Sequence, residues 1–312
     1  MGAYAFDPEY SSFDNQIIAT ETQQNIYSYA NFKIHEHLIW TIGLAYEDNE
    51  NLSADINEFN PKLGVQWTIN PHLSLRAAAF KAIQSLYAVE QTIEPTQVAG
   101  FNQLNDYSNM TVLKNYGVGL DLRFNDRLFG GFSALRQDNE VPFGILEVPD
   151  FYVVWDYQRD FYNAYLYWLP NRSWAVSASW NYEDFAAGEN STLPQLFGSV
   201  PDRLQTISLP VNIQYFDPSG FFAGLGVTYV NQKIRYLDPQ SLAVSPTQNE
   251  NFAVVSAGLG YRFPKRWGLV SLEATNLLDQ QFHFQDDSFI VREPNPLYIP
   301  ERIWFGRLVV NF

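Results

Sequence analysis

Cysteine is absent from the 312-residue sequence, which excludes both a disulfide framework and a thiolate metal site. No stretch of about 18 apolar residues occurs, so we expect no transmembrane helix. Basic residues are few, with 19 Lys and Arg against 34 Asp and Glu, so the basic stripe of a nucleic-acid-binding protein is missing. The start, MGAYAFDPEY, has no basic region and no apolar core, so we expect a mature chain or a fragment rather than a signal peptide.

Aromatic residues, by contrast, are abundant. The sequence contains 24 Phe, 19 Tyr and 8 Trp, although its mean hydropathy is only −0.22. A high aromatic content in a mildly polar chain is typical of a membrane β-barrel, in which only alternate residues meet lipid.

Strand-like runs follow one another along the whole chain, joined alternately by short turns and long loops. Asn, Asp, Pro and Gly lie at the short joints, where tight turns need them. Short turns on one rim and long loops on the other are typical of an outer-membrane barrel. The paired runs are 26–34 with 38–47, 57–69 with 73–81, 112–124 with 128–136, 161–169 with 173–184, 205–216 with 221–234, and 252–263 with 267–278.

The last run is 303–312, and the segment 2–6 supplies a further strand that makes the total even. We therefore predict an all-β fold, a transmembrane antiparallel up-and-down β-barrel of about fourteen strands, with twelve to sixteen tolerated. Short periplasmic turns and long extracellular loops would join these strands. The barrel would form a single domain over residues 1–312, or a piece of a larger barrel.

Apolar and polar residues alternate along these runs. Trp174, Trp180 and Tyr182 share one face of their run, whereas Asn181 points to the other. This alternation predicts an apolar outer face toward lipid and a polar inner face. Pro210 lies inside a run and cannot donate to the ladder, so we expect a bulge there.

Aromatic residues near the strand ends predict two girdles at the membrane surfaces. Trp174 and Tyr182 are about 26 Å apart along a strand, which is about 20 Å of height at a tilt near 40°. That height is close to the separation of two girdles. The predicted girdle residues are Trp40, Trp67, Trp168, Trp174, Trp180, Tyr182, Tyr229, Tyr261 and Trp304.

The chain ends on an apolar strand, RIWFGRLVVNF. A soluble sheet rarely leaves such an edge bare, although the final strand of a soluble β-sandwich is the alternative. This strand resembles the terminal strand of bacterial outer-membrane proteins. The resemblance implies that Leu308, Val310 and Phe312 form the signal that the barrel-assembly machinery reads.

Three further segments resemble the β-barrel of TonB-dependent outer-membrane receptors. They are FNPKLGVQWTINPHLSLRAAAFKAI at 59–83, SLEATNLLDQQF at 271–282 and YIPERIWFGRLVVNF at 298–312. The resemblance implies a location in the outer membrane of a Gram-negative bacterium. It does not extend to the receptors' N-terminal plug or TonB-contacting box, so energy-coupled uptake is not carried over.

Charged residues occur on the predicted inner face. They would either line an aqueous pore and select solutes, or pair across strands and fill the interior. Arg307 and Glu273 lie on consecutive strands at similar predicted heights, so we expect them to pair. The lumen-lining candidates are Lys62, Arg76, Asp121, Arg123, Arg262, Glu273 and Arg307.

The loop 83–111 is long and rather apolar, so we expect it to constrict the lumen, to cap its mouth or to pack on neighbouring loops. His35 and His37 provide only two metal ligands at a turn, so we expect no metal site. No Ser-His-Asp arrangement stands out, and no phosphate loop or dinucleotide fingerprint occurs, so we expect neither an enzyme nor a cofactor.

These features predict an outer-membrane transport barrel, a receptor-like channel or porin that passes a solute or polymer. One alternative is a non-conducting membrane anchor or assembly module for another domain or partner, and a less favoured one is a membrane-embedded enzyme. The expected partners are outer-membrane lipid, the barrel-assembly machinery and the transported solute. The sequence leaves open the substrate, the direction of transport and the oligomeric state.

Overall fold

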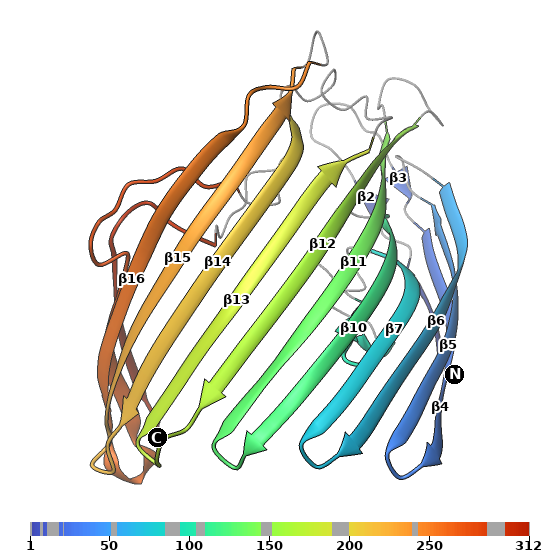
Figure 1. Ribbon diagram of the computed structural model, residues 1–312. Coiled ribbons are helices and arrows are strands. Elements are labelled where there is room, and N and C mark those ends of the chain that lie inside the picture. Colours follow the sequence, from blue (N-terminus) through green and yellow to red (C-terminus); the bar gives the residue numbers. More distant parts are fainter. Residues whose placement is uncertain are drawn as a thin grey trace. The chain divides into compact units, whose positions relative to one another are not determined.

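The computed structural model describes residues 2–6, 9–10, 19–20, 22–50, 55–84, 94–103, 110–144, 152–188, 200–238, 243–285 and 297–311. These residues are mostly in β-strands, and the only helical element among them is a 3-10 turn, η1 (Pro264–Arg266) (Figure 1). In the described ranges, no helix is long and apolar enough to cross a membrane.

Fourteen strands form one sheet in which, with the small hairpins left aside, neighbours in the chain are neighbours in space. The order begins at β1 and ends at β18. The strands are β1 (Gly2–Phe6), β4 (Thr22–His35), β5 (Leu38–Glu50), β6 (Asp55–Asn70), β7 (Leu73–Ile83), β10 (Val112–Asn125), β11 (Leu128–Gly144), β12 (Tyr152–Trp168), β13 (Trp174–Ala187), β14 (Val200–Phe216), β15 (Phe221–Leu237), β16 (Gln248–Arg262), β17 (Gly268–Thr275) and β18 (Ile303–Val310).

Two small hairpins lie outside this sheet. One pairs β2 (Glu9–Tyr10) with β3 (Ala19–Thr20), and the other pairs β8 (Gln97–Val98) with β9 (Phe101–Asn102). The chain divides into two compact units. Unit 1 comprises Met1–Leu120, Ala134–Asp160 and Ala186–Leu196, and unit 2 comprises Asp121–Ser133, Phe161–Phe185 and Phe197–Phe312.

The predicted all-β, up-and-down antiparallel architecture is confirmed, with fourteen strands in the main sheet. The strands reach further than predicted on the side of the long loops. For example, β11 was predicted to end at Arg136 but continues to Gly144, and β12 begins at Tyr152 rather than at Phe161. These extensions carry polar residues on both faces, so the apolar alternation that marks a lipid-facing strand is lost while the ladder continues.

Side-chain caps explain why Asn and Asp occupy the short turns. In four turns an Asx oxygen accepts a hydrogen bond from the backbone N–H two residues later, which stabilises a tight reversal. Each of these bonds is 2.8 Å long, from His72 to Asn70, from Arg127 to Asn125, from Ser173 to Asn171 and from Ser219 to Asp217. Hydrogen bonds from Ser219 lower the pKa of Asp217 in its turn.

The bulge predicted at Pro210 is wrong. The β14–β15 ladder keeps its register through Pro210, which lies opposite Thr228, and the register shift falls instead between Pro201 and Arg203. Proline removes one N–H donor but inserts no extra residue, so at most one ladder hydrogen bond is missing at this position.

Each unit has one apolar, exposed face. In unit 1 this face carries Ile42, Leu44, Leu63, Trp67 and Val118, and in unit 2 it carries Leu209, Val211, Ile213, Leu225 and Val227. We call this the outer face and the opposite one the inner face. Since exposed aliphatic rows of this kind need a non-aqueous surrounding, they suit contact with lipid.

Candidate functional site: segments folded onto the inner face

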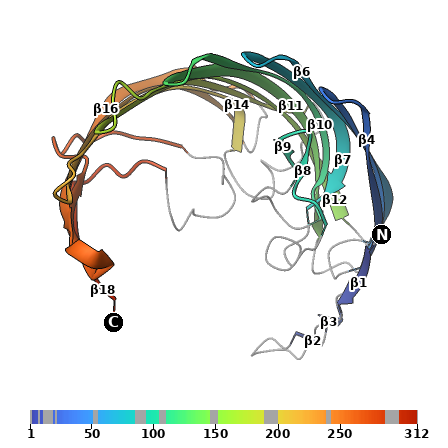
Figure 2. The ribbon, with the colours of Figure 1, turned by 90° about the horizontal axis from the view of Figure 1, so that it is seen from below.

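In unit 1, the hairpin β8–β9 lies on the inner face beside β7 and β10 (Figure 2). Glycines on two strands make its close approach possible. A Cβ atom added at Gly64 would lie 2.8 Å from Cβ of Ala99, and one at Gly117 would lie 2.6 Å from Cδ1 of Phe101. Side chains larger than glycine at these two positions would therefore push the hairpin away from the sheet.

Apolar contacts hold the tip of the hairpin. Val98, Ala99 and Phe101 are buried against Ala78 and Phe80 of β7, and a further contact comes from Leu135. Arg76 of β7 covers this cluster from one side. Its Nη1 donates to the carbonyl of Gly100 over 2.9 Å, and its Cζ lies 4.6 Å from the centroid of the Phe101 ring, within reach of a cation–π contact.

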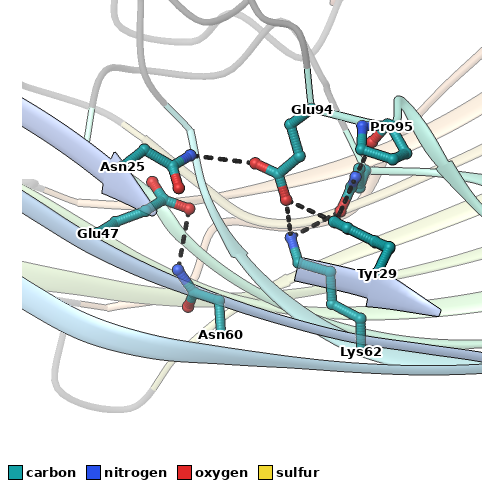
Figure 3. Close-up of polar contacts among 8 residues, drawn as sticks. Asn25, Tyr29, Glu47, Asn60, Lys62, Glu94 and Pro95 are labelled. Atoms are coloured by element: carbon teal, nitrogen blue, oxygen red, sulfur yellow. Dashed lines mark hydrogen bonds and ion pairs between the residues drawn. The ribbon is translucent and has the colours of Figure 1, made fainter. Parts of the chain in front are cut away.

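A buried ion pair anchors the base of the hairpin. Nζ of Lys62 on β6 lies 3.0 Å from Oε1 of Glu94, and the two side chains are only 1% and 8% exposed (Figure 3). Lys62 also donates to Oε1 of Gln103 over 2.7 Å, so it bridges the start and the end of the folded-in segment. A buried charge requires such partners, because leaving water is costly for an unpaired ion.

Strand β4 completes the shell around Glu94. The hydroxyl of Tyr29 donates to Oε1 over 2.5 Å, and Nδ2 of Asn25 donates to Oε2 over 3.1 Å. Nearby, Asn60 donates to Glu47 over 2.9 Å, as Figure 3 shows. Glu94 thus receives donors from two strands of the sheet, so this network fixes the hairpin in place. Its arrangement is that of a structural network and not of a catalytic nucleophile with a general base.

In unit 2, residues 281–285 and 297–298 are folded onto the inner face of β14–β16. Phe282 stacks on Phe252 with 3.9 Å between ring centroids, and Phe284 and Tyr298 pack on the same cluster. Gln285 and Gln232 exchange two hydrogen bonds, Gln285 N to Oε1 over 2.9 Å and Nε2 to the Gln285 carbonyl over 2.8 Å. Together these contacts attach the segment to the strands.

Two cavities lie on the inner face of unit 2. One, of about 540 Å³, lies between β12–β15 and the folded-in segment, and the other, of about 460 Å³, lies further along β14–β17. Both fall in the size range of small-molecule sites. In the described ranges, no group of three or more His, Asp or Glu side chains could hold a metal ion.

Residues 2–277 match the family described as TonB-dependent receptor-like, β-barrel. The chain belongs to this family. It therefore has the fold of an outer-membrane barrel of a transport family, and its location is the outer membrane of a Gram-negative bacterium. No curated protein matches the sequence.

Solved receptor structures share the fold at low sequence identity. The FrpB iron transporter from Neisseria meningitidis is 16% identical with a TM-score of 0.63, and the match covers 92% of this chain and 45% of that one. The siderophore receptor PirA from Acinetobacter baumannii is 14% identical, with a TM-score of 0.57 and the same coverage. The ferric enterobactin receptor PfeA from Pseudomonas aeruginosa is 14% identical with a TM-score of 0.58, covering 86% of this chain and 41% of that one. The chain spans less than half the length of these receptors.

The structure brings two of the lumen-lining candidates together at one feature, because Lys62 and Arg76 both contact the β8–β9 segment. Two others, Asp121 and Arg123, lie in unit 2 near the short turn that follows β10. Asp121 accepts a 2.6 Å hydrogen bond from the Tyr165 hydroxyl, and Arg123 forms a 2.6 Å ion pair with Asp126. Arg262, Glu273 and Arg307 lie on β16–β18 of unit 2.

The predicted ion pair between Arg307 and Glu273 is wrong. Between the described strands β17 and β18, Arg307 lies opposite Ser271 and Glu273 opposite Phe305, and no ion pair joins the two charges. Ser271 donates instead to Oε1 of Glu273 over 3.3 Å. Along the paired strands, Arg307 lies two residues beyond Phe305, the residue opposite Glu273. The alternation of apolar and polar residues does not reveal this offset.

Most of the predicted girdle residues are exposed, namely Trp67, Trp168, Trp174, Trp180, Tyr229 and Trp304, whereas Trp40, Tyr182 and Tyr261 are partly buried. Leu308 and Val310 of the predicted assembly signal are also exposed, and Phe312 lies outside the described residues. The girdle and the signal both stay predictions. Sequence reasoning missed Glu94, which is one of three acidic residues in the rather apolar loop 83–111 and has no pattern that singles it out.

Proposed function

We propose that this chain forms part of the solute-passing barrel of an outer-membrane receptor that takes up an iron chelate. The observation that carries the proposal is the family match over residues 2–277. The iron transporter and the two siderophore receptors described above share its fold, which favours an iron chelate over other solutes. The inner-face cavities of unit 2 would provide contacts for such a solute.

Binding of ferric chelates to the full chain, purified in detergent, tests this proposal. The sequence has 8 Trp, so quenching of intrinsic fluorescence would report a chelate on the inner face. We expect saturable quenching by at least one ferric chelate and none by the same chelator without iron. Absence of saturable binding across hydroxamate, catecholate and mixed chelates would reject iron uptake as the function.

A second candidate is a non-conducting anchor or assembly module. The ion-paired β8–β9 hairpin favours it, because a segment fixed on the inner face narrows any passage along unit 1. Planar-bilayer conductance separates the two candidates. A barrel that binds no solute and shows no conductance, even after deletion of residues 94–103, would support the anchor.

The remaining predictions extend this proposal. The chain would form one barrel domain, would have no catalytic activity, and would bind no nucleic acid. Lys62 is buried beneath the β8–β9 hairpin, so the other charged inner-face candidates would line the passage, namely Arg76, Asp121, Arg123, Arg262, Glu273 and Arg307. The aromatic girdles would set the depth of the barrel in the membrane. The barrel-assembly machinery would engage β18 through Leu308, Val310 and Phe312.

A further inference from the structure

We propose that the outer face of unit 2 carries a binding site for the phosphorylated glycolipid of the outer leaflet, built around Lys233 of β15 and Asn249 of β16. The chain lies in the outer membrane, whose outer leaflet contains lipid A, a glucosamine disaccharide that carries acyl chains and phosphates. This inference goes beyond the proposed function, because a lipid site on the outer face does not depend on the solute that passes inside.

The outer face of β15 changes from apolar to polar residues along the strand. Leu225, Val227 and Tyr229 are exposed on this face, and Lys233 continues the same row, since residues two apart share a face. From Phe221 to Lys233 the row measures about 40 Å along the strand, which is about 30 Å of height at a tilt near 40°. The apolar band of such a barrel is about 25 Å tall, so Lys233 lies at the level of the lipid head groups.

The connections of β15 identify the leaflet. A short turn joins Phe216 to Phe221 before the strand, whereas the longer connection 238–247 leads from it to β16. In outer-membrane barrels the short turns are periplasmic and the longer loops are extracellular. Lys233 lies near the end of β15 that precedes the longer connection, and its outer-face position therefore meets the outer leaflet.

Lys233 and Asn249 lie directly opposite each other on neighbouring strands (Figure 1). Residues opposite each other in an antiparallel pair have Cβ atoms about 4.5–5.5 Å apart. Both side chains are exposed, and Lys233 forms no ion pair or side-chain hydrogen bond with the residues that the structure describes. The ammonium group of Lys233 and the amide of Asn249 are thus close enough to donate to one phosphate group.

Neighbouring side chains orient the amide of Asn249. Its Oδ1 accepts a 2.9 Å hydrogen bond from Nδ2 of Asn231, which also donates to Oδ1 of Asn251. The hydroxyl of Tyr229 donates to the same Oδ1 of Asn251 over 3.0 Å. The Nδ2 donors of Asn249 and Asn251 form no hydrogen bond within the described part of the chain. These donors suit the oxygen atoms of a phosphate and of sugar hydroxyl groups.

The charges beside this pair leave one cation in excess. Arg203 of β14 lies opposite Arg235 of β15, two residues beyond Lys233. Asp184 forms a 2.6 Å ion pair with Arg203. Asp202 forms another, also over 2.6 Å, with Arg235. Both arginines are therefore paired with carboxylates, and the remaining positive charge, that of Lys233, is the one that attracts an anion.

The outer face of unit 1 provides a contrast. Lys114 of β10 shares a face with the exposed residues Tyr116 and Val118, and it also lies at the end of its strand next to a long loop. Its Nζ, however, lies 2.6 Å from Oε1 of Glu140. A phosphate would have to displace this carboxylate, so we expect no phosphate site at Lys114.

Binding of lipid A to the full chain in detergent, followed by native mass spectrometry at increasing lipid concentration, tests this inference. We expect lipid A with both phosphates to bind at least about fivefold more tightly than dephosphorylated lipid A and than phosphatidylglycerol, which has a phosphate but no sugar. Equal binding of either control lipid, or no binding of lipid A, would overturn the inference. Displacement of lipid A by excess inorganic phosphate would indicate a site for free phosphate and would also overturn it.

Three variants connect the binding to this site, and heat-modifiable migration on gels reports that each one is folded. Lys233→Gln should weaken binding of lipid A by about fivefold, which is about 1 kcal/mol, without weakening that of dephosphorylated lipid A. Asn249→Asp keeps the acceptor for Asn231 but places a carboxylate opposite Lys233, so it should weaken binding at least as much. Lys114→Gln removes a cation that is already paired and should leave binding unchanged. Equal effects of Lys233→Gln and Lys114→Gln would show attraction by overall charge and would overturn the inference.

Discussion

Replacing Lys62 with methionine should detach the β8–β9 hairpin from the inner face of unit 1. The substitution removes both the 3.0 Å ion pair with Glu94 and the 2.7 Å hydrogen bond to Gln103. Glu94 would keep its donors from Tyr29 and Asn25 but lose the ion pair with Lys62. Breaking one side of a buried pair typically lowers the free energy of unfolding by about 3–5 kcal/mol.

Undocking of the hairpin limits this loss. If the hairpin leaves the sheet, Glu94 regains contact with water. The measured loss therefore cannot exceed the free energy with which the hairpin docks on the sheet. The double variant Lys62→Met with Glu94→Gln removes both charges, and we expect it to lose less than Lys62→Met alone. The pair of Lys81 with Glu58 provides the control, because its side chains are 19% and 40% exposed and water screens it far more than the buried pair.

Two measurements are needed, urea unfolding in detergent and hydrogen exchange of the amides in residues 94–103. In Lys62→Met we expect a lower free energy of unfolding, faster hydrogen exchange in residues 94–103, or both. Hydrogen exchange in β6, the strand of Lys62, should stay unchanged. In Lys81→Met both changes should be much smaller, because that pair is less buried. If Lys62→Met and Lys81→Met behaved alike, the buried pair would not be what holds the hairpin.

Three further predictions concern the two faces and the membrane. Val211→Arg, on the outer face, should destabilise folding in lipid by about 2–4 kcal/mol, whereas Asn212→Arg, on the inner face, should be much milder; equal folding yields would show that the faces are misassigned. Gly117→Ala should displace the β8–β9 hairpin and speed its hydrogen exchange, because the added Cβ would lie 2.6 Å from Phe101, whereas Gly306→Ala, with nothing within 4 Å, should have no effect. The protein should partition into detergent and show heat-modifiable migration on gels, and a monodisperse protein without detergent would contradict its place in the membrane.

The sequence was sufficient for the strands and their turns, for physical reasons visible at particular residues. Asn125 and Asn171 lie where a side chain must cap a tight reversal, and each does so over 2.8 Å. Strand ends on the long-loop side were missed because the ladder continues beyond the apolar band. There, residues such as Arg136 and Asp138 form ion pairs on the surface, and nothing in their alternation marks a strand.

The contact partners of side chains were much less predictable than the face of the sheet on which each side chain lies. Alternation indicated that Lys62 points inward, but its partner Glu94 is 32 residues away in a loop whose path depends on glycines of β6 and β10. The same limit explains the missed register of Arg307 and Glu273, which are offset by one same-face position. Period-two patterns specify the face of a residue, whereas contacts depend on register and on the course of loops.

The family motifs near the end of the chain now have a physical explanation. Asn276 exchanges hydrogen bonds with the backbone of Gln280, donating over 2.9 Å and accepting over 3.0 Å. Asp279 accepts a 3.0 Å bond from the backbone of Arg302, at the start of the terminal strand. The segments 271–282 and 298–312, which resemble receptor barrels, therefore act together to set how β17 leads to β18.

Uptake of iron by cells that make the full chain tests the proposed function most directly. The cells should lack other receptors for ferric chelates, and labelled ferric iron should be supplied as a chelate that binds the purified chain. Gly224 lines the cavity of about 460 Å³, and an added Cβ there would meet nothing closer than 3.9 Å, whereas the side chain of Leu225 is exposed on the outer face. We predict uptake with the unaltered chain and with Leu225→Phe, and loss of uptake with Gly224→Phe at equal amounts of protein in the outer membrane. Uptake that is absent with the unaltered chain, or that persists unchanged in Gly224→Phe, would contradict a path for iron chelates along the inner face of unit 2.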